Sequence, residues 1–187
     1  MKVLRASDYK RMPWKNGGGE TVEIAVFPPS ASVNDFDWRI STATVAADGP
    51  FSIFSGIDRT LSILDGNGMA LQIDGKAPIL LTKERAPLAF AADIPVHATL
   101  PDGAITDLNV MTRRGRFDHD VNRLTGDFRV KKERETDTIL LLATGTVSVE
   151  AGGKRFGLNA LDALLVNDAA QVKAGNIACY VIRLTLL

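Results

Sequence analysis

Cysteine is almost absent from this chain of 187 residues, and the single one, Cys179, excludes an internal disulfide. It lies in the apolar run 177–182, where a small buried side chain is a simpler interpretation than a nucleophile. Histidine is also scarce: His97 and His119 belong to no H-x-H pattern, and no C-x-x-C pair exists. We therefore expect no metal site, although a site built from carboxylates alone stays open. The G-x-S-x-G pattern is missing too, so covalent catalysis has no support.

An excess of one charge is missing as well, since Lys and Arg total 22 and Asp and Glu total 22. Proteins that coat nucleic acid or bind membranes through basic residues need surplus positive charge, so we expect neither partner. A net charge of zero favours self-association, for instance as a homodimer. No apolar run approaches the roughly 18 residues that cross a bilayer, and the first residues lack the apolar centre of a signal peptide. A cytoplasmic protein is therefore expected.

The chain does contain enough apolar sequence for a buried core. Apolar residues make up 45% and charged residues 24%, which excludes general disorder, and the length suits one domain or two small lobes. Short apolar, β-branched segments alternate with turns rich in Gly and Asp, such as 65–68 and 74–75. Helical periodicity is weak, with one short turn expected near residues 7–9. This pattern predicts an all-β sandwich or barrel.

An internal repeat is visible, because the segment 59–76 is echoed by 137–154. Each copy reads as an apolar strand, a turn with Gly, an alternating strand and a Gly-Lys turn. Two copies of one β unit predict two stacked lobes. A charged connector, residues 113–137, separates the two copies and contains an expected hairpin over 121–130. Its mixed charges are interpreted as a face exposed to solvent. The expected domains are residues 1–130, a first lobe with the connector hairpin, and residues 131–187, a second lobe packed with it as one compact unit.

Two polar clusters occur in expected loops. In residues 13–24 (PWKNGGGETVEI), three glycines would let the backbone approach a ligand closely. The lysine precedes the glycines and a strand follows them, which argues against a nucleotide-binding loop. Residues 48–59 end on Asp58 and Arg59, and an arginine there could clamp a carboxylate. Each cluster also has a purely structural interpretation, as a turn between strands and as an Asp–Arg pair that holds a loop.

A third group of polar residues follows from strand alternation. Two expected strands each carry polar side chains on one face. These faces consist of Asp107, Asn109, Met111 and Arg113 on one strand and Arg39, Ser41 and Ala43 on the other. Facing inward, they would line a pocket for a polar small molecule; the alternative is that they face solvent.

Four segments, 13–24, 36–41, 48–59 and 108–113, resemble the HutD/Ves family in residues, order and spacing. The resemblance covers nearly the whole chain. It implies a cupin-type double-stranded β-helix in a bicupin arrangement, with two small β-barrels in one chain. The sequence departs from the family at Ser55, where proline is common, so that loop is expected to be less rigid.

The resemblance also implies a function. The family is linked to histidine utilisation, and its members are suspected governors of the pathway that bind a pathway intermediate such as N-formylglutamate. The resemblance implies no established catalysis and no cofactor. Of the metal-binding histidines of other cupins, only His97 falls near an equivalent place, so neither a metal nor another cofactor is expected. Matching the family motifs gives the expected ligand-binding residues Trp14, Lys15, Asn16, Arg59, Asn109 and Arg113.

The leading hypothesis is thus a small-molecule-binding regulator with no catalytic residues. Arg59 or Lys15 would oppose the charge of a carboxylate. Asn16 and Asn109 would bind amide or formyl groups, and Trp14 would supply an apolar wall.

Two alternatives from other classes stay open. One is a metal-independent enzyme, an isomerase or hydrolase, that acts on a similar small polar acid through an acid or base. Its candidate acid or base is His97, Glu20 or Asp58. The other is a structural or interaction module with an empty barrel.

Overall fold

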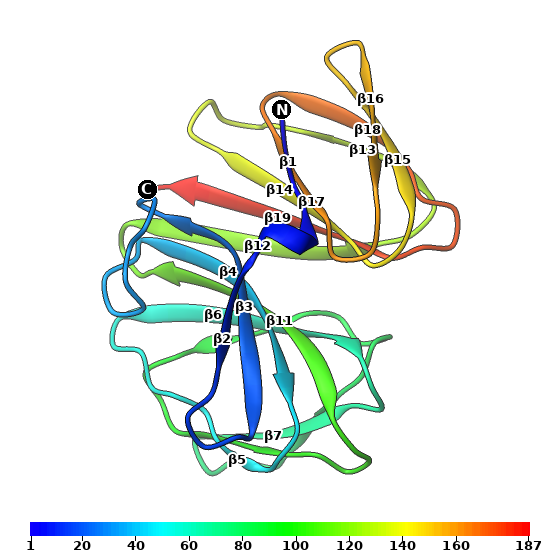
Figure 1. Ribbon diagram of the computed structural model, residues 1–187. Coiled ribbons are helices and arrows are strands. Elements are labelled where there is room, and N and C mark those ends of the chain that lie inside the picture. Colours follow the sequence, from blue (N-terminus) through cyan, green and yellow to red (C-terminus); the bar gives the residue numbers. More distant parts are fainter. The chain divides into compact units, whose positions relative to one another are not determined.

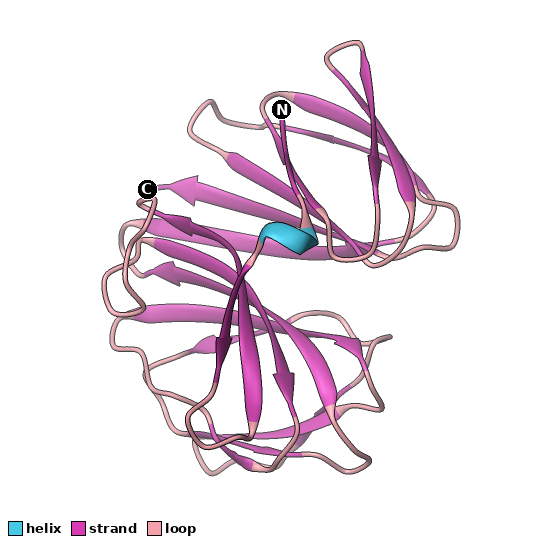
Figure 2. Ribbon diagram, viewed as in Figure 1, coloured by secondary structure: helices cyan, strands magenta, loops and turns pink.

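The computed structural model describes residues 1–187, and its regular secondary structure is almost entirely β-strand, which confirms the expected all-β class (Figures 1 and 2). Its one helix, η1 (Ala6–Asp8), is a short 3-10 turn at the place where a helical turn was expected. The molecule accordingly has no helix with the length and apolar character that crossing a bilayer requires.

The chain divides into two compact units. The central unit comprises residues Lys10–Arg116, and the terminal unit combines Met1–Tyr9 with Phe117–Leu187. This boundary differs from the expected one between residues 130 and 131. The reason is strand pairing over long sequence separations: β12 (Phe117–Leu124) pairs along its whole length with β19 (Cys179–Leu186), and β1 (Lys2–Leu4) pairs with β17 (Ala163–Val166). Each unit is described separately below.

The central unit contains a six-stranded and a four-stranded antiparallel sheet. The larger sheet has the order β2 (Lys10–Pro13), β3 (Gly19–Phe27), β4 (Trp38–Val45), β11 (Ile105–Arg113), β6 (Ile57–Asp65) and β9 (Leu88–Ala91). The smaller has the order β5 (Gly49–Pro50), β10 (Val96–Thr99), β7 (Met69–Ile73) and β8 (Ile79–Leu81). Buried side chains of both sheets, such as Leu61 and Ile63 of β6 and Leu71 of β7, pack into one core, so the sheets lie face to face.

The terminal unit is built in the same way. Its five-stranded sheet has the order β1, β17, β14 (Thr138–Ala143), β19 and β12. Its four-stranded sheet has the order β13 (Asp127–Lys131), β18 (Ala169–Lys173), β15 (Val147–Ala151) and β16 (Lys154–Leu158). The core between them contains apolar side chains, such as Ile139 and Val149, and Cys179, which is fully buried, as the simpler interpretation of that residue predicted. Burial raises the pKa of the Cys179 thiol to about 11.

The strand order repeats from one unit to the next. The order β4-β11-β6-β9 recurs as β12-β19-β14-β17, and the order β5-β10-β7-β8 recurs as β13-β18-β15-β16. The repeated segments 59–76 and 137–154 contain β6–β7 and β14–β15, which occupy equivalent places in these sheets. The hairpin expected over residues 121–130 does not form. The strands β12 and β13 follow each other along the chain, but β12 pairs with β19 in one sheet and β13 pairs with β18 in the other.

Candidate functional site

Polar side chains line part of the inner face of the central six-stranded sheet. Residues that lie opposite one another on paired strands project from the same face. Asp107 on β11 lies opposite Ile63 of the core, and Asn109 lies opposite Leu61, so both project inward. By the same register Ser41 and Arg39 of β4 lie opposite Asn109 and Met111. Arg59 of β6 lies opposite Met111 from the other side.

Arg59 is the most unusual residue of this face, because its guanidinium is buried and makes no direct ion pair with a carboxylate. The residue is 5% exposed, its Nε has no hydrogen-bond partner, and its Nη2 donates only to the Sδ of Met111, at 3.4 Å. Phe51, Phe54 and Phe90 lie around it, with ring centroids 5.2, 5.3 and 5.9 Å from Cζ. Burial lowers the pKa of Arg59 to about 10, although the charge of Asp107 opposes this shift. Such a cation lacks most of its hydration without a compensating ion pair.

Asp107 is a buried carboxyl group on the same face. It is 1% exposed, and Asn109 donates from Nδ2 to its Oδ1 at 2.5 Å. Burial raises the pKa of Asp107 to about 7, against the opposing influence of the positive charge of Arg59 and a backbone hydrogen bond from Ala43. Near neutral pH this carboxyl therefore exists in both protonation states, as an acid–base group does.

The second buried arginine of the inner face is already paired. Arg39, which is 5% exposed, donates from Nε to Oε2 of Glu23 on β3 at 2.8 Å. The two charges compensate each other. Among the buried cations of the central unit, Arg59 alone is left without a carboxylate contact.

The structure places three of the six expected ligand-binding residues, Arg59, Asn109 and Arg113, on this face of the sheet. Trp14 is half-buried, packs on the same core and donates from Nε1 to Oγ1 of Thr21 at 2.8 Å. Arg113 lies at the end of β11, where it donates from Nε and Nη2 to the carbonyl oxygen of Phe36 at 3.1 and 2.8 Å. That contact fixes the segment that precedes β4.

The other two expected residues are not on the inner face. Lys15 and Asn16 lie in an exposed turn between β2 and β3. The Asn16 side chain stabilises the turn itself, since its Oδ1 accepts a hydrogen bond from the backbone N–H of Gly18 at 3.0 Å. The motif match located this loop but carried no information on which way its side chains point.

The glycine segment has a packing role that involves Gly19. A Cβ at this position would lie 2.1 Å from the backbone oxygen of Thr44 on β4 and 3.0 Å from the Trp14 ring. At Gly18 it would meet only the Asn16 side chain, at 3.3 Å. The three glycines suggested that the backbone comes close to a ligand. At Gly19 the backbone instead comes close to the neighbouring strand β4.

We predict that Gly19→Ala lowers the free energy of unfolding by about 1–3 kcal/mol, since the backbone of β4 must move to admit a methyl group. Gly18→Ala, the matched control, should cost less because the Asn16 side chain can rotate away. Urea denaturation followed by circular dichroism measures both. Equal losses in the two variants would contradict the prediction.

The acid–base residues expected for an enzyme lie elsewhere. His97 is exposed on β10. Glu20 pairs with Arg11 at 2.8 Å, and Asp58 pairs with Arg114 at 2.7 Å. None of the three is on the polar inner face. No three His, Cys, Asp or Glu side chains gather in a way that could hold a metal ion.

Sequence reasoning missed part of the buried cluster. It placed Arg39 and Asp107 on the polar faces of their strands but did not include either among the expected ligand-binding residues. Phe51 and Phe54 were inside the second polar motif, yet nothing in the motif showed that they surround Arg59. The signal that could have found Asp107 is a carboxylate two residues before an asparagine, on the polar side of an otherwise buried strand.

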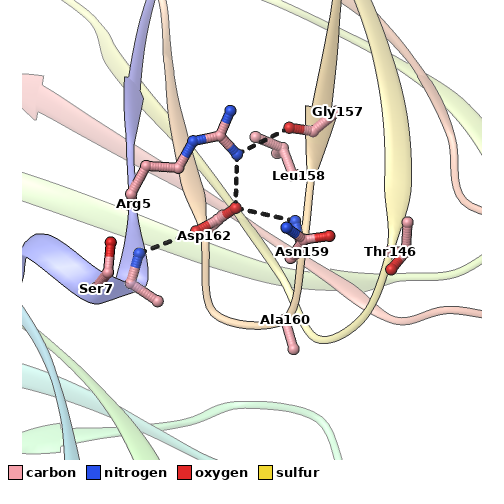
Figure 3. A pocket seen from close by; sticks show the side chains of 9 residues that line it. Arg5, Ser7, Thr146, Gly157, Leu158, Asn159, Ala160 and Asp162 are labelled. Carbon is pink, nitrogen blue, oxygen red and sulfur yellow. Dashed lines mark hydrogen bonds and ion pairs between the residues drawn. The ribbon is translucent and has the colours of Figure 1, made fainter.

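A pocket of about 510 Å³ lies in the terminal unit (Figure 3). It is lined by Arg5, Ala6, Ser7, Thr146, Gly157, Leu158, Asn159, Ala160 and Asp162. In Figure 3 the carboxylate of Asp162 accepts hydrogen bonds from Arg5 Nη1, at 2.7 Å, and from the backbone N–H of Asn159, at 3.0 Å. It also accepts one from the backbone N–H of Ala6 at 2.9 Å. The charged pair of this pocket, Arg5 and Asp162, is thus satisfied internally, and we regard the central unit as the better candidate.

Comparison with known proteins agrees with the sequence motifs. A family model described as HutD matches residues 6–180. An uncharacterized 21.2 kDa protein in the hutC 3′ region of Pseudomonas putida is 36% identical over 161 residues, which are 84% of this chain and 83% of that protein. Protein Ves of Citrobacter koseri is 43% identical over 113 residues, 58% of each chain. The structure of HutD from Pseudomonas fluorescens is 32% identical with a TM-score of 0.84, covering 100% of this chain and 98% of that one.

A more distant structure shows the fold alone. A cupin 2 conserved barrel domain protein from Leptotrichia buccalis is 11% identical, with a TM-score of 0.59 over 95% of this chain and 96% of that one. The chain therefore has a cupin-like all-β fold.

Proposed function

The chain belongs to the HutD family, and from this premise we propose that it is a regulator of histidine utilisation that binds a small carboxylic acid, such as N-formylglutamate, in its central unit. The observation that carries the proposal is the buried guanidinium of Arg59, which contacts no carboxylate directly and whose Nε has no hydrogen-bond partner. Such a cation costs free energy in the free protein unless a ligand compensates it. A carboxylate is a suitable partner, because it accepts two parallel hydrogen bonds from one guanidinium.

The remainder of the ligand would contact both polar and apolar side chains. Asn109 offers an amide to a formyl or amide group, and Phe51, Phe54 and Phe90 offer apolar walls. The names of the relatives, HutD and a protein in the hutC 3′ region, support the link to histidine utilisation. Ligand contacts by Trp14, Lys15, Asn16 and Arg113 remain predictions of the motif match.

The wider arrangement is also proposed. The repeated strand order supports a bicupin in which each unit is one cupin barrel. A homodimer and a cytoplasmic location remain predictions from composition and sequence.

A second candidate function is favoured by one observation. Asp107, with a pKa near 7, shares the inner face with Arg59, so an acid–base group and a carboxylate-binding group lie in one place. A metal-independent isomerase or hydrolase acting on a similar small acid would use this pair. Asp107 would take the role that the sequence assigned to His97, Glu20 or Asp58.

Isothermal titration calorimetry with N-formylglutamate, urocanate and glutamate tests the main proposal. We expect saturable binding of N-formylglutamate by the folded protein, with no change in the ligand after incubation. Chemical conversion of the ligand, followed by chromatography, would favour the enzyme instead. If a protein with native circular dichroism binds none of the three, the regulator proposal fails and an interaction module is favoured.

A further inference from the structure

Asp107 is placed to respond to an anion that binds Arg59. The two residues project from the same sheet face on the neighbouring strands β11 and β6, and both are almost fully buried, at 1% and 5% exposure. Charges in such surroundings interact strongly because little water screens them. The attraction of Asp107 opposes the effect of burial on Arg59, and Arg59 does the same for Asp107.

We propose that Asp107 takes up one proton when a carboxylate binds to Arg59, so that the site binds its anionic ligand together with a proton. This inference rests on the proposed function and extends it. It makes Asp107 a residue that adjusts the charge of the site, and it makes ligand affinity depend on pH.

A count of the charges that face Asp107 supports the proposal. Arg39 on β4 is compensated by Glu23 on β3, at 2.8 Å. Strands β7, β8 and β10 of the facing sheet contribute only apolar side chains to the core: Met69, Leu71, Leu81, Val96 and Ala98. His97 of β10 is exposed. Arg113 shares this strand face at the end of β11 and lies 3.8 Å from Asp37, so these two charges compensate each other. Arg59 and an ionised Asp107 are therefore left to balance each other.

A bound carboxylate would change this balance. With Arg59 matched by the ligand, an ionised Asp107 would be left as a buried negative charge without a cation, which is strongly unfavourable. Protonation removes that charge at little cost, because burial already holds the pKa of Asp107 at about 7 in the free protein. The proton comes from solvent and stays on a carboxylate oxygen of Asp107. The hydrogen bond from Asn109 can persist on the other oxygen.

Calorimetry in buffers of different ionisation enthalpy measures this proton directly. The probe is N-formylglutamate, whose carboxyl groups are ionised throughout the range from pH 6 to 8.5, so that protons taken up must bind to the protein. We expect uptake approaching one proton per bound probe at pH 8, and much less at pH 6, where Asp107 is largely protonated beforehand. Affinity should fall by up to about tenfold per pH unit above pH 7.

Two variants identify the group. Asp107→Asn should bind the probe without proton uptake and with an affinity that does not change with pH. Asp58→Asn is the matched control, because it removes a carboxylate next to Arg59 in sequence that pairs with Arg114 instead, and it should keep the wild-type uptake.

The possible results separate the two proposals. Binding at pH 8 without proton uptake, or uptake that persists in Asp107→Asn, overturns this inference and leaves the proposed function intact. Absence of binding at every pH overturns both. If Asp107→Asn does not fold, the wild-type buffer series alone decides whether one proton accompanies the probe.

Discussion

Arg59→Met is expected to weaken carboxylate binding strongly and, at the same time, to stabilise the protein. Loss of a charge-assisted contact should weaken N-formylglutamate binding by about 1.5–3 kcal/mol. Methionine has a similar reach and no charge, so it can fill the space among the three phenylalanine rings without the cost of a buried, unpaired cation. Replacing buried charges by apolar groups commonly raises stability by about 1–4 kcal/mol. Some of this gain is offset by the lost cation–π contacts and by the lost attraction between Arg59 and the buried carboxyl of Asp107.

Calorimetry and urea denaturation measure the two effects separately. Arg39→Met is the matched control, since it removes the other buried arginine but leaves Glu23 without its partner at 2.8 Å. That variant should lose about 3–5 kcal/mol of stability. If Arg59→Met is destabilised as much as Arg39→Met, Arg59 has a structural role and the case for a ligand at this position disappears.

Asp137→Ala should be the most damaging single substitution that we predict for the terminal unit, at about 3–5 kcal/mol. The Asp137 side chain is 1% exposed and accepts four hydrogen bonds. They come from the backbone N–H groups of Glu133 and Arg134 at 3.1 and 3.0 Å, from Arg183 Nη1 at 2.7 Å and from Thr185 Oγ1 at 2.9 Å. Alanine would leave these donors without their common acceptor in a partly buried place.

The loss should also depend on pH. Burial alone would raise the pKa of Asp137, but the hydrogen bonds to its charged form lower it to about 2, below the unfolded value of 3.8. A lowered pKa means that the stabilisation is complete above about pH 4 and is lost as the pH falls towards 2. The difference in stability between wild type and Asp137→Ala should therefore shrink by about 2 kcal/mol between pH 6 and pH 2.

Denaturation curves at several pH values check this prediction. Asp127→Ala, an exposed carboxylate of β13 in the same unit, serves as the control and should stay within about 0.5 kcal/mol of wild type. An effect of Asp137→Ala that is equally small, or that does not vary with pH, would contradict the argument.

The sequence predicted those features of the fold that depend on local patterns. Alternation and Gly-Asp turns predicted the all-β class, and the repeat between segments 59–76 and 137–154 matches strands in equivalent sheet positions. Long-range pairing was not predictable in this way. The partner of β1 is β17, far along the chain, and nothing within residues 1–9 or 117–130 indicates that these segments belong together.

The site was predictable to a similar extent. Residues 107–113 were assigned a polar face correctly, and Arg59 was singled out. The register that sets Arg59 opposite Met111, two residues from Asn109 and four from Asp107, depends on how β6 pairs with β11. Family motifs mark loops as well as cavities, which explains why Lys15 and Asn16 were expected beside Arg59 but lie in an exposed turn.

The assignment of β1 to the terminal unit has a consequence for biosynthesis. Residues Lys10–Arg116 form one uninterrupted stretch, so the central unit can fold as soon as that stretch has left the ribosome. The first nine residues must wait, because β17, the strand they pair with, is among the last to be translated. Nascent chains stalled after residue 150 should therefore protect the central unit from protease while their N-terminal segment remains cleavable.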